Sequence, residues 1–258
     1  MKSKNIVFTK PNVAELIEEE VRLPKKGEVL VKLCVSSISS GTERANLTGD
    51  ENVSYNSPAQ KAVFPRRSGY SSAGIVEKVG EGVTKFKVGD RVALWWSNHN
   101  EYITISENNA CHIDDISFEE AALFHIATFP MAAIRKCRLE IGESAIVMGM
   151  GMLGIIAVKL LKVAGAVPVI AVDPDPQKRE KAISCGADFA FDPYDKDFAE
   201  KVRKITDGGA NVGIEVTGIG AGLDGILDCM ARFGRVALLG CTRNSDFTTI
   251  TARFTAPE

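Results

Sequence analysis

Two patterns of hydrophobic positions divide the chain. Up to about residue 115 the apolar runs are short and are interrupted by Gly, Pro, Ser and Asn; they lie at 5–8, 29–35, 73–79 and 90–94. Runs of this kind predict an antiparallel, barrel-like β domain. The polar, turn-rich stretch at 44–62 predicts a mobile surface loop.

From about Phe118 onward, apolar runs alternate with stretches of helical period. The predicted strands are 145–148, 167–172, 212–216 and 235–239. The helices predicted between them are 153–164, 177–184, 198–205 and 223–230. Strands separated by helices imply right-handed crossovers and a parallel sheet covered on both faces. We therefore expect an α/β fold, with a β-barrel domain at 1–122 and a doubly wound, Rossmann-type parallel sheet at 123–258.

Composition narrows the classes of partner. The 258 residues include 31 Lys and Arg and 33 Asp and Glu, which gives a net charge of -2, so we expect no nucleic-acid partner. The start of the chain lacks the apolar core of a secretory signal, and Lys159, Lys162 and Pro168 break the longest apolar region. These features predict a cytoplasmic protein with no membrane partner. The six cysteines form no C-x-x-C pair, so no structural zinc cluster is expected.

The clearest chemical signature is Gly149-Met150-Gly151-Met152-Leu153-Gly154, a G-x-G-x-x-G run between a predicted strand and a predicted helix. Gly149 would permit the tight turn, Gly151 would let the backbone approach a pyrophosphate, and Gly154 would let the helix pack closely on the strand. The amides of Met152 and Leu153, with the helix dipole, would bind the anion. A glycine-rich turn without a ligand is the structural alternative.

An acidic residue, Asp173, ends the next predicted strand, where it would accept hydrogen bonds from the adenosine ribose. Its carboxylate favours NAD over NADP because it would repel a 2′-phosphate; the nearby Lys178 and Arg179 keep NADP as an alternative. A second match, at 220–225, also follows a strand, but no acid ends the strand after it. We interpret this second run as a loop beside the nicotinamide, or as a simple turn.

Several further motifs, and the order in which they occur along the chain, resemble those of the medium-chain dehydrogenase/reductase superfamily, which includes the zinc-type alcohol dehydrogenases and their relatives. They are residues 69–76 (GYSSAGIV), 79–83 (VGEGV), 89–92 (GDRV), 120–122 (EAA) with Thr128, and the glycine run. The resemblance covers about residues 29–240. It implies an N-terminal GroES-like barrel that is catalytic. It also implies an NAD(P)(H)-dependent oxidoreductase that moves hydride between nicotinamide and a small-molecule alcohol or carbonyl. Residues 38–43 and 69–71 are similar to a subgroup that includes bacteriochlorophyllide dehydrogenase-like proteins.

Zinc-dependent members carry metal ligands at positions that the resemblance aligns with Ser39, Tyr70-Ser71 and Phe124. A zinc site needs thiolate, imidazole or carboxylate ligands, so we expect no metal here. A zinc enzyme with displaced ligands remains an alternative. His125, beside Phe124, is interpreted as a core residue rather than a ligand, and His99 and His112 as surface or loop residues.

Without zinc, the developing alkoxide needs a hydrogen-bond or proton donor. The resemblance places Thr42 where the superfamily keeps a proton-relay hydroxyl. We expect Tyr70 or Thr42 to donate to the substrate oxygen, with Ser39 beside them; a polar loop without catalytic role is the alternative. Glu43 and Arg44 are either an ion pair that orders the loop or a solvated pair. Thr128, and Thr217 and Gly218 at a strand end, are expected to contact the cofactor.

Members of the superfamily usually continue past the fifth Rossmann strand with a sixth, which is often a dimer edge. Here 248–258 show neither helical period nor strand alternation. We therefore expect a chain truncated at its C-terminus, lacking the usual last strand and leaving a strand edge open. Such a truncation makes a non-catalytic dinucleotide-binding remnant the main alternative to an active enzyme. The sequence leaves the oligomeric state undecided, with a homodimer as one possibility.

Overall fold

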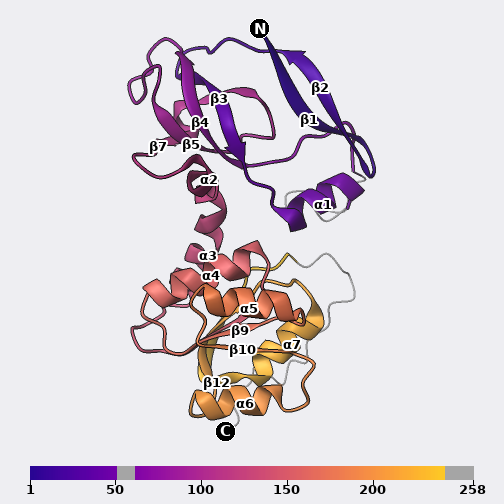
Figure 1. The fold of residues 1–258 in the computed structure, drawn as a ribbon, viewed down its shortest axis with the longest axis vertical. Helices are drawn as coiled ribbons and strands as arrows, with labels where there is room; N and C mark the ends of the chain where they lie inside the picture. The colour runs from indigo at the N-terminus through magenta and orange to yellow at the C-terminus, as the bar shows by residue number, and fades with distance from the viewer. Residues whose placement is uncertain (51–61, 242–258) are drawn as a thin grey trace. The chain divides into compact units, whose positions relative to one another are not determined.

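The computed structural model describes residues 1–50 and 62–241, and the chain divides into two compact units (Figure 1). The first unit is Met1–Ile126 and the second is Ala127–Glu258. The boundary falls inside the helix α3 (Phe124–Lys136), a few residues beyond the predicted position after residue 122. Each unit has its own sheet and its own buried apolar clusters.

A five-stranded antiparallel sheet forms the core of the first unit, which confirms the predicted β domain. Its strand order is β6-β3-β4-β5-β7. The strands are β3 (Glu28–Ser36), β4 (Ser71–Val79), β5 (Arg91–Trp95), β6 (Tyr102–Ser106) and β7 (Ala110–His112). Val29, Val31 and Val92 are fully buried and pack in one apolar cluster, whereas Leu30, which is also buried, lies outside that cluster, as the alternation of side chains along a strand requires.

Two features of the first unit were not predicted. β1 (Lys2–Lys10) and β2 (Val13–Glu20) pair as a separate antiparallel hairpin, of which the apolar pattern showed only a part. α1 (Ser40–Thr48) occupies the start of the stretch predicted to be a loop, so that prediction is wrong for residues 44–48. The helix is polar, and its buried residues, Glu43 and Ala45, explain its formation, because tertiary contacts override a weak local pattern. Residues 51–61, the remainder of that predicted loop, lie outside the described residues.

The remaining elements of the first unit are two short helical segments. A 3-10 turn, η2 (Glu107–Asn109), separates β6 from β7, and α2 (Phe118–Ala121) follows β7. Ser117 and Glu120 form a capping box at the start of α2: the Glu120 amide donates to Ser117 Oγ at 3.1 Å and the Ser117 amide donates to Glu120 at 3.2 Å.

The second unit contains the predicted doubly wound parallel sheet. Its strand order is β10-β9-β8-β11-β12, and every pairing is parallel. The strands are β8 (Ala145–Met148), β9 (Val169–Val172), β10 (Phe189–Phe191), β11 (Ala210–Glu215) and β12 (Met230–Leu238). The strand order reverses between β8 and β11, and ligands of such sheets bind at this switch point, outside the carboxyl ends of the strands.

Two strands of this sheet differ from the prediction. β10 is only three residues long, too short for a periodic pattern to show. β12 begins at Met230, which was assigned to the preceding helix, and its register with β11 shifts between Ala210 and Val212. Within residues 127–241, β12 pairs with β11 and forms one edge of the sheet; the tail at 248–258 lies outside the described residues.

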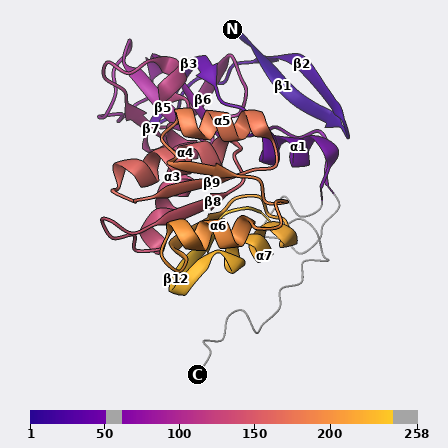
Figure 2. The ribbon, with the colours of Figure 1, turned by 60° about the horizontal axis from the view of Figure 1, so that its bottom comes forward.

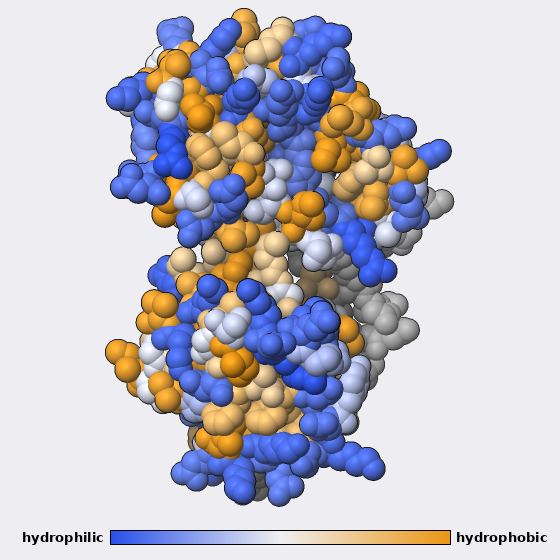
Figure 3. Space-filling view, viewed as in Figure 1, coloured by the Kyte–Doolittle hydropathy of each residue, from blue (hydrophilic) through white to orange (hydrophobic). Residues whose placement is uncertain are grey.

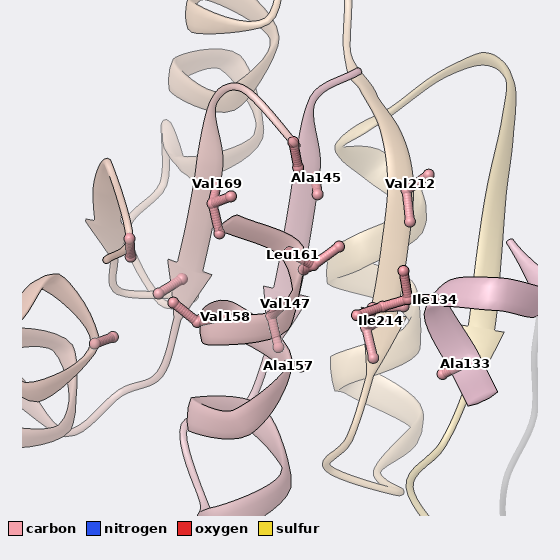
Figure 4. Packing of buried hydrophobic residues seen from close by; sticks show 14 of the residues in the cluster. Ala133, Ile134, Ala145, Val147, Ala157, Val158, Leu161, Val169, Val212 and Ile214 are labelled. Atoms are coloured by element: carbon pink, nitrogen blue, oxygen red, sulfur yellow. The ribbon is translucent and has the colours of Figure 1, made fainter. Parts of the chain in front are cut away.

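Helices cover both faces of the parallel sheet, as the alternating pattern predicted. Figure 2 shows α4 and α5 on one face and α6 and α7 on the other. Their bounds are α4 (Met152–Val163), α5 (Pro176–Ser184), α6 (Phe198–Ile205) and α7 (Gly220–Asp228). Figure 4 shows α4 side chains, among them Val158 and Leu161, beside strand residues such as Val147 and Val169, and all four are fully buried. This packing holds the start of α4 at the end of β8.

The face shown in Figure 3 mixes hydrophilic and hydrophobic residues over both units. Among residues 1–50 and 62–241, no helix has the length and apolarity needed to cross a membrane.

Candidate functional site

The turn between β8 and α4 is built from backbone. Gly149 has a φ of +100°, a conformation that side chains rarely allow, and its amide donates to Val172 O at 2.7 Å. A Cβ on Gly154 would lie 1.9 Å from Gly149 O, so a side chain there would push the helix away from the turn. These two glycines let α4 start directly against the strand end, as the sequence suggested.

The outer side of the same turn is open. Gly151 is the N-cap of α4, and a Cβ added to it would meet nothing within 4 Å. The Ile155 amide donates to Gly151 O at 3.0 Å, so the amides of Met152 and Leu153 precede the first intrahelical bond. Free amides and the positive end of a helix dipole attract anions. The geometry therefore suits the pyrophosphate of a dinucleotide.

Asp173, at the end of β9, connects the turn to the next loop. Its side chain is buried, with Oδ2 accepting from the Met150 amide at 2.8 Å and Oδ1 accepting from the Asp175 amide at 2.9 Å. Lys178 Nζ lies 3.8 Å from Oδ2. A carboxylate has about four acceptor sites, so two amides leave capacity for the hydroxyls of a ribose. The structure thus brings Asp173 and Lys178 to the glycine turn.

A second strand-end carboxylate, Glu215 of β11, was not recognised from the sequence. It is buried and accepts from the Thr217 amide at 2.7 Å, from the Thr217 hydroxyl, and from the Gly218 amide at 3.1 Å. A Cβ on Gly149 would lie 2.8 Å from Thr217 Cγ2, so the two loops at the switch point touch. Glu215 holds Thr217 and Gly218, the residues expected at the nicotinamide, in one conformation.

The other residues that were expected near the cofactor are Thr128 and the second glycine run at 220–225. Thr128 is a partly buried residue of α3 in the second unit. Residues 220–225, interpreted above as a loop or turn, form the first turns of α7, with Ile219 as N-cap, so that interpretation is wrong. A Cβ on Gly222 would meet Thr217 Oγ1 at 2.4 Å. The glycines of this second run therefore allow close packing of a helix on its loop.

In the first unit, two of the three predicted catalytic residues are in direct contact. The Tyr70 hydroxyl donates to Ser39 Oγ at 2.7 Å. Ser39 is the N-cap of α1, but its side chain makes no capping bond, so its hydroxyl is available to Tyr70. Thr42 lies within α1, partly buried, and its carbonyl oxygen accepts from Asn46 Nδ2 at 2.9 Å. The geometry links Tyr70 to Ser39; the role of Thr42 stays a prediction.

Aromatic rings surround Tyr70. Its ring centroid lies 6.1 Å from that of Trp96 and 5.6 Å from that of His125, and the His125 ring meets the Trp96 ring edge-on at 5.2 Å. Burial lowers the pKa of His125, which favours its neutral form near pH 7. His125 is partly buried in this aromatic cluster. Apolar surroundings strengthen any hydrogen bond that the Tyr70 hydroxyl makes to a charged oxygen.

The other positions aligned with zinc ligands also hold groups unsuited to zinc. Ser71 Oγ is buried and donates to Ala122 O at 2.6 Å, while Phe124 is 47% exposed. Within the described parts of the chain, no three His, Cys, Asp or Glu side chains gather as they would around a metal ion. The donor chemistry of these positions therefore does not fit a zinc site.

One expectation for the first unit is wrong, and another holds only in part. His99, expected at the surface or in a loop, lies in the loop between β5 and β6 but is only 7% exposed, and its Nε2 lies 2.7 Å from Glu43 Oε2. Glu43 pairs with this histidine rather than with its neighbour Arg44. No sequence signal could have found the pair, because 56 residues separate its members. His112 is exposed, as expected, and its Nε2 lies 2.9 Å from Lys85 O.

Comparison with known families finds two matches that together span most of the chain. A family described as alcohol dehydrogenase GroES-like domain matches residues 25–129. A family described as zinc-binding dehydrogenase matches residues 153–255. The two matches fall in the same order as the two sheets described above.

Individual relatives agree with these families. (R,R)-butanediol dehydrogenase of Bacillus subtilis is 29% identical over 80% of this chain and 67% of its own length. L-threonine 3-dehydrogenase of Pyrococcus horikoshii is 29% identical over 91% of this chain and 75% of its own. Among solved structures, 2R,3R-butanediol dehydrogenase from Bacillus subtilis superposes with a TM-score of 0.79 at 24% identity, covering 91% of this chain and 76% of that one.

Proposed function

The chain belongs to the medium-chain dehydrogenase/reductase superfamily and is an NAD(P)-dependent, alcohol dehydrogenase-like oxidoreductase. From this premise we propose that it is an NAD-linked, zinc-independent enzyme in which Tyr70 and Ser39 transfer the proton. The substrate is a small alcohol or the matching carbonyl compound. The observation that carries the proposal is the hydrogen bond from Tyr70 to Ser39, two residues that the family resemblance aligns with metal-ligand positions of zinc-dependent members.

The cofactor assignment is supported by the cradle at the end of β8. The open space outside Gly151 and the amides at the start of α4 would hold the pyrophosphate. Asp173 would accept from the ribose, and its negative charge disfavours the 2′-phosphate of NADP. Lys178, half-exposed at 3.8 Å from Asp173, offsets part of this preference. The nicotinamide, when bound, accepts or supplies the hydride.

The proton steps belong to the first unit. During carbonyl reduction, the Tyr70 hydroxyl donates its proton to the oxygen that becomes the alcohol, and the Ser39 hydroxyl donates to the tyrosinate that forms. During alcohol oxidation the steps run in reverse: Tyr70, having first lost its proton to solvent, takes the proton of the alcohol as hydride leaves the carbinol carbon. The Trp96 and His125 rings lie beside the phenol, and aromatic neighbours of this kind would strengthen its bond to the developing alkoxide.

Zinc is not part of this proposal. Ser39, Tyr70, Ser71 and Phe124 supply no thiolate, imidazole or carboxylate. His99 and Glu43 are of ligand type, but their 2.7 Å separation is that of a hydrogen bond. Two ligands of one zinc ion each stand about 2 Å from the metal at a tetrahedral angle, which places them more than 3 Å apart.

The test is turnover on a panel of small alcohols with NAD⁺ and with NADP⁺, using protein assayed for metal content and treated with a chelator. We expect turnover with a preference for NAD⁺ that survives chelation. Stoichiometric zinc whose removal abolishes turnover would instead establish the displaced-ligand enzyme. NADH binding without oxidation of any alcohol would establish a non-catalytic protein.

A further inference from the structure

Three polar side chains of the first unit form a continuous chain of contacts, in which Glu43 and His99 are buried and Ser36 is partly buried. Ser36 Oγ, at the end of β3, lies 2.8 Å from His99 Nδ1, and His99 Nε2 lies 2.7 Å from Glu43 Oε2. His99 and Glu43 are each 7% exposed. A buried carboxylate is costly unless each oxygen has a partner. The partners of Glu43 therefore indicate what the chain holds in place.

The other oxygen of Glu43 holds Ser39. Glu43 Oε1 accepts from the Ser39 amide at 3.0 Å, and the Glu43 amide donates to Ser39 O at 2.9 Å. Both backbone polar groups of Ser39 are thus bound to one residue. The Ser39 hydroxyl is left to accept from Tyr70. The position of that hydroxyl depends on Glu43.

His99 also contacts the segment that carries Tyr70. The His99 amide donates to Ser68 O at 3.1 Å, and the Trp96 amide donates to Tyr70 O at 2.9 Å. A Cβ on Gly69 would lie 3.0 Å from two carbons of the His99 ring, and Gly69 has a φ of +94°. The imidazole therefore packs on the backbone immediately before Tyr70 while its nitrogen holds Glu43.

We propose that Glu43 and His99 are positioning residues that together set the separation of the Tyr70 and Ser39 hydroxyls. The proposal rests on the function proposed above for those two hydroxyls. Glu43 reaches Ser39 through the backbone amide, so the pair orients the catalytic hydroxyls and carries no proton between them. Misplacing a proton donor by about 1 Å can lower a rate by about 100-fold.

The direct test is the NMR resonance of the Tyr70 ring carbon that bears the hydroxyl, in protein labelled with ¹³C-tyrosine and assigned with Tyr70→Phe. We expect Glu43→Ala to move this resonance to the position seen in Ser39→Ala, because both break the same hydrogen bond. Glu107→Ala is the matched control: Glu107 also accepts backbone amides in this unit, from Thr84 and Lys85, and should leave Tyr70 unchanged.

Milder variants keep the test decisive if Glu43→Ala does not fold. Glu43→Gln retains an acceptor for the Ser39 amide and should leave the Tyr70 resonance near its wild-type position, whereas His99→Leu, which removes the partner nitrogen, should move it. A Tyr70 resonance that stays in place in folded Glu43→Ala or His99→Leu would overturn the proposal. This readout needs no turnover, so it separates failure of the positioning pair from failure of the proposed function.

Kinetics provide the second test. Glu43→Ala should lower kcat by about 100-fold with little change in the KM for the cofactor. Combining it with Tyr70→Phe should lower kcat no further than Tyr70→Phe alone, because both act through one hydroxyl. Multiplicative losses in the double variant would contradict the proposal. Full activity of Tyr70→Phe would instead refute the assignment of Tyr70, while the NMR result still decides the positioning role.

Discussion

The two sets of candidate functional residues differ in which groups they use: one uses mainly backbone groups and the other uses side chains. The proposed dinucleotide cradle uses backbone: the glycine turn, the first amides of α4, and one carboxylate that binds amides. The part proposed to handle the proton uses side chains from separate segments, with Tyr70, Ser39, Glu43 and His99 joined by hydrogen bonds. A backbone site is damaged by adding atoms, whereas a side-chain site is damaged by removing them. The two therefore need opposite kinds of substitution.

The largest effect is expected in the side-chain part. Tyr70→Phe removes the proposed proton donor and leaves the ring among its aromatic neighbours, so kcat should fall by about 100-fold or more while the protein stays folded. Stopped-flow or steady-state assays with saturating cofactor give kcat, and NADH fluorescence gives the binding constant. Unchanged kcat would contradict the role of Tyr70, and a weakened NADH affinity would contradict the division into two parts.

The next effect distinguishes two glycines of the backbone part. Gly154→Ala places a Cβ 1.9 Å from Gly149 O and should destabilise the protein by about 2 kcal/mol. Gly151→Ala meets open space and should change the stability by no more than about 0.5 kcal/mol. Urea unfolding followed by circular dichroism measures both. Equal stability of the two variants would show that α4 does not start against the strand in the way described.

The smallest effect depends on an ionised side chain of the first unit. Hydrogen bonds from Arg22 lower the pKa of Glu28 from 4.5 to about 2. A depressed carboxyl pKa stabilises the fold above pH 4.5, and this contribution is lost as the pH falls from 4.5 towards 2. Because Arg22 is about half exposed, the contribution is about 1 kcal/mol at most.

Glu28→Gln should therefore be less stable than the wild type at pH 7, with the difference shrinking below pH 4.5. Both tryptophans of the chain, Trp95 and Trp96, lie in the first unit, so their fluorescence reports on its unfolding. A difference that is the same at pH 7 and pH 3 would mean that the charge of Glu28 does not contribute.

The same division explains what could be predicted from the sequence. The glycine turn is contiguous, and Asp173 ends the next strand, so local patterns predicted the parallel sheet and the strand-end turn at which we propose the cofactor. Tyr70 and Ser39 are 31 residues apart; the family resemblance singled out each of them, but not their hydrogen bond. The Glu43–His99 pair is set only by tertiary packing. α1 escaped prediction for the same reason, since its few buried residues leave no helical pattern.

The most direct test of the account is a calorimetric titration of NADH into the wild-type protein and into Gly151→Val. A valine there would fill the open side of the turn, where the pyrophosphate is proposed to lie, and apart from its immediate chain neighbours its Cβ would meet no protein atom within 4 Å. The account predicts binding to the wild type and loss of binding in a variant that unfolds at the wild-type urea concentration. Equal binding by the two proteins would contradict it.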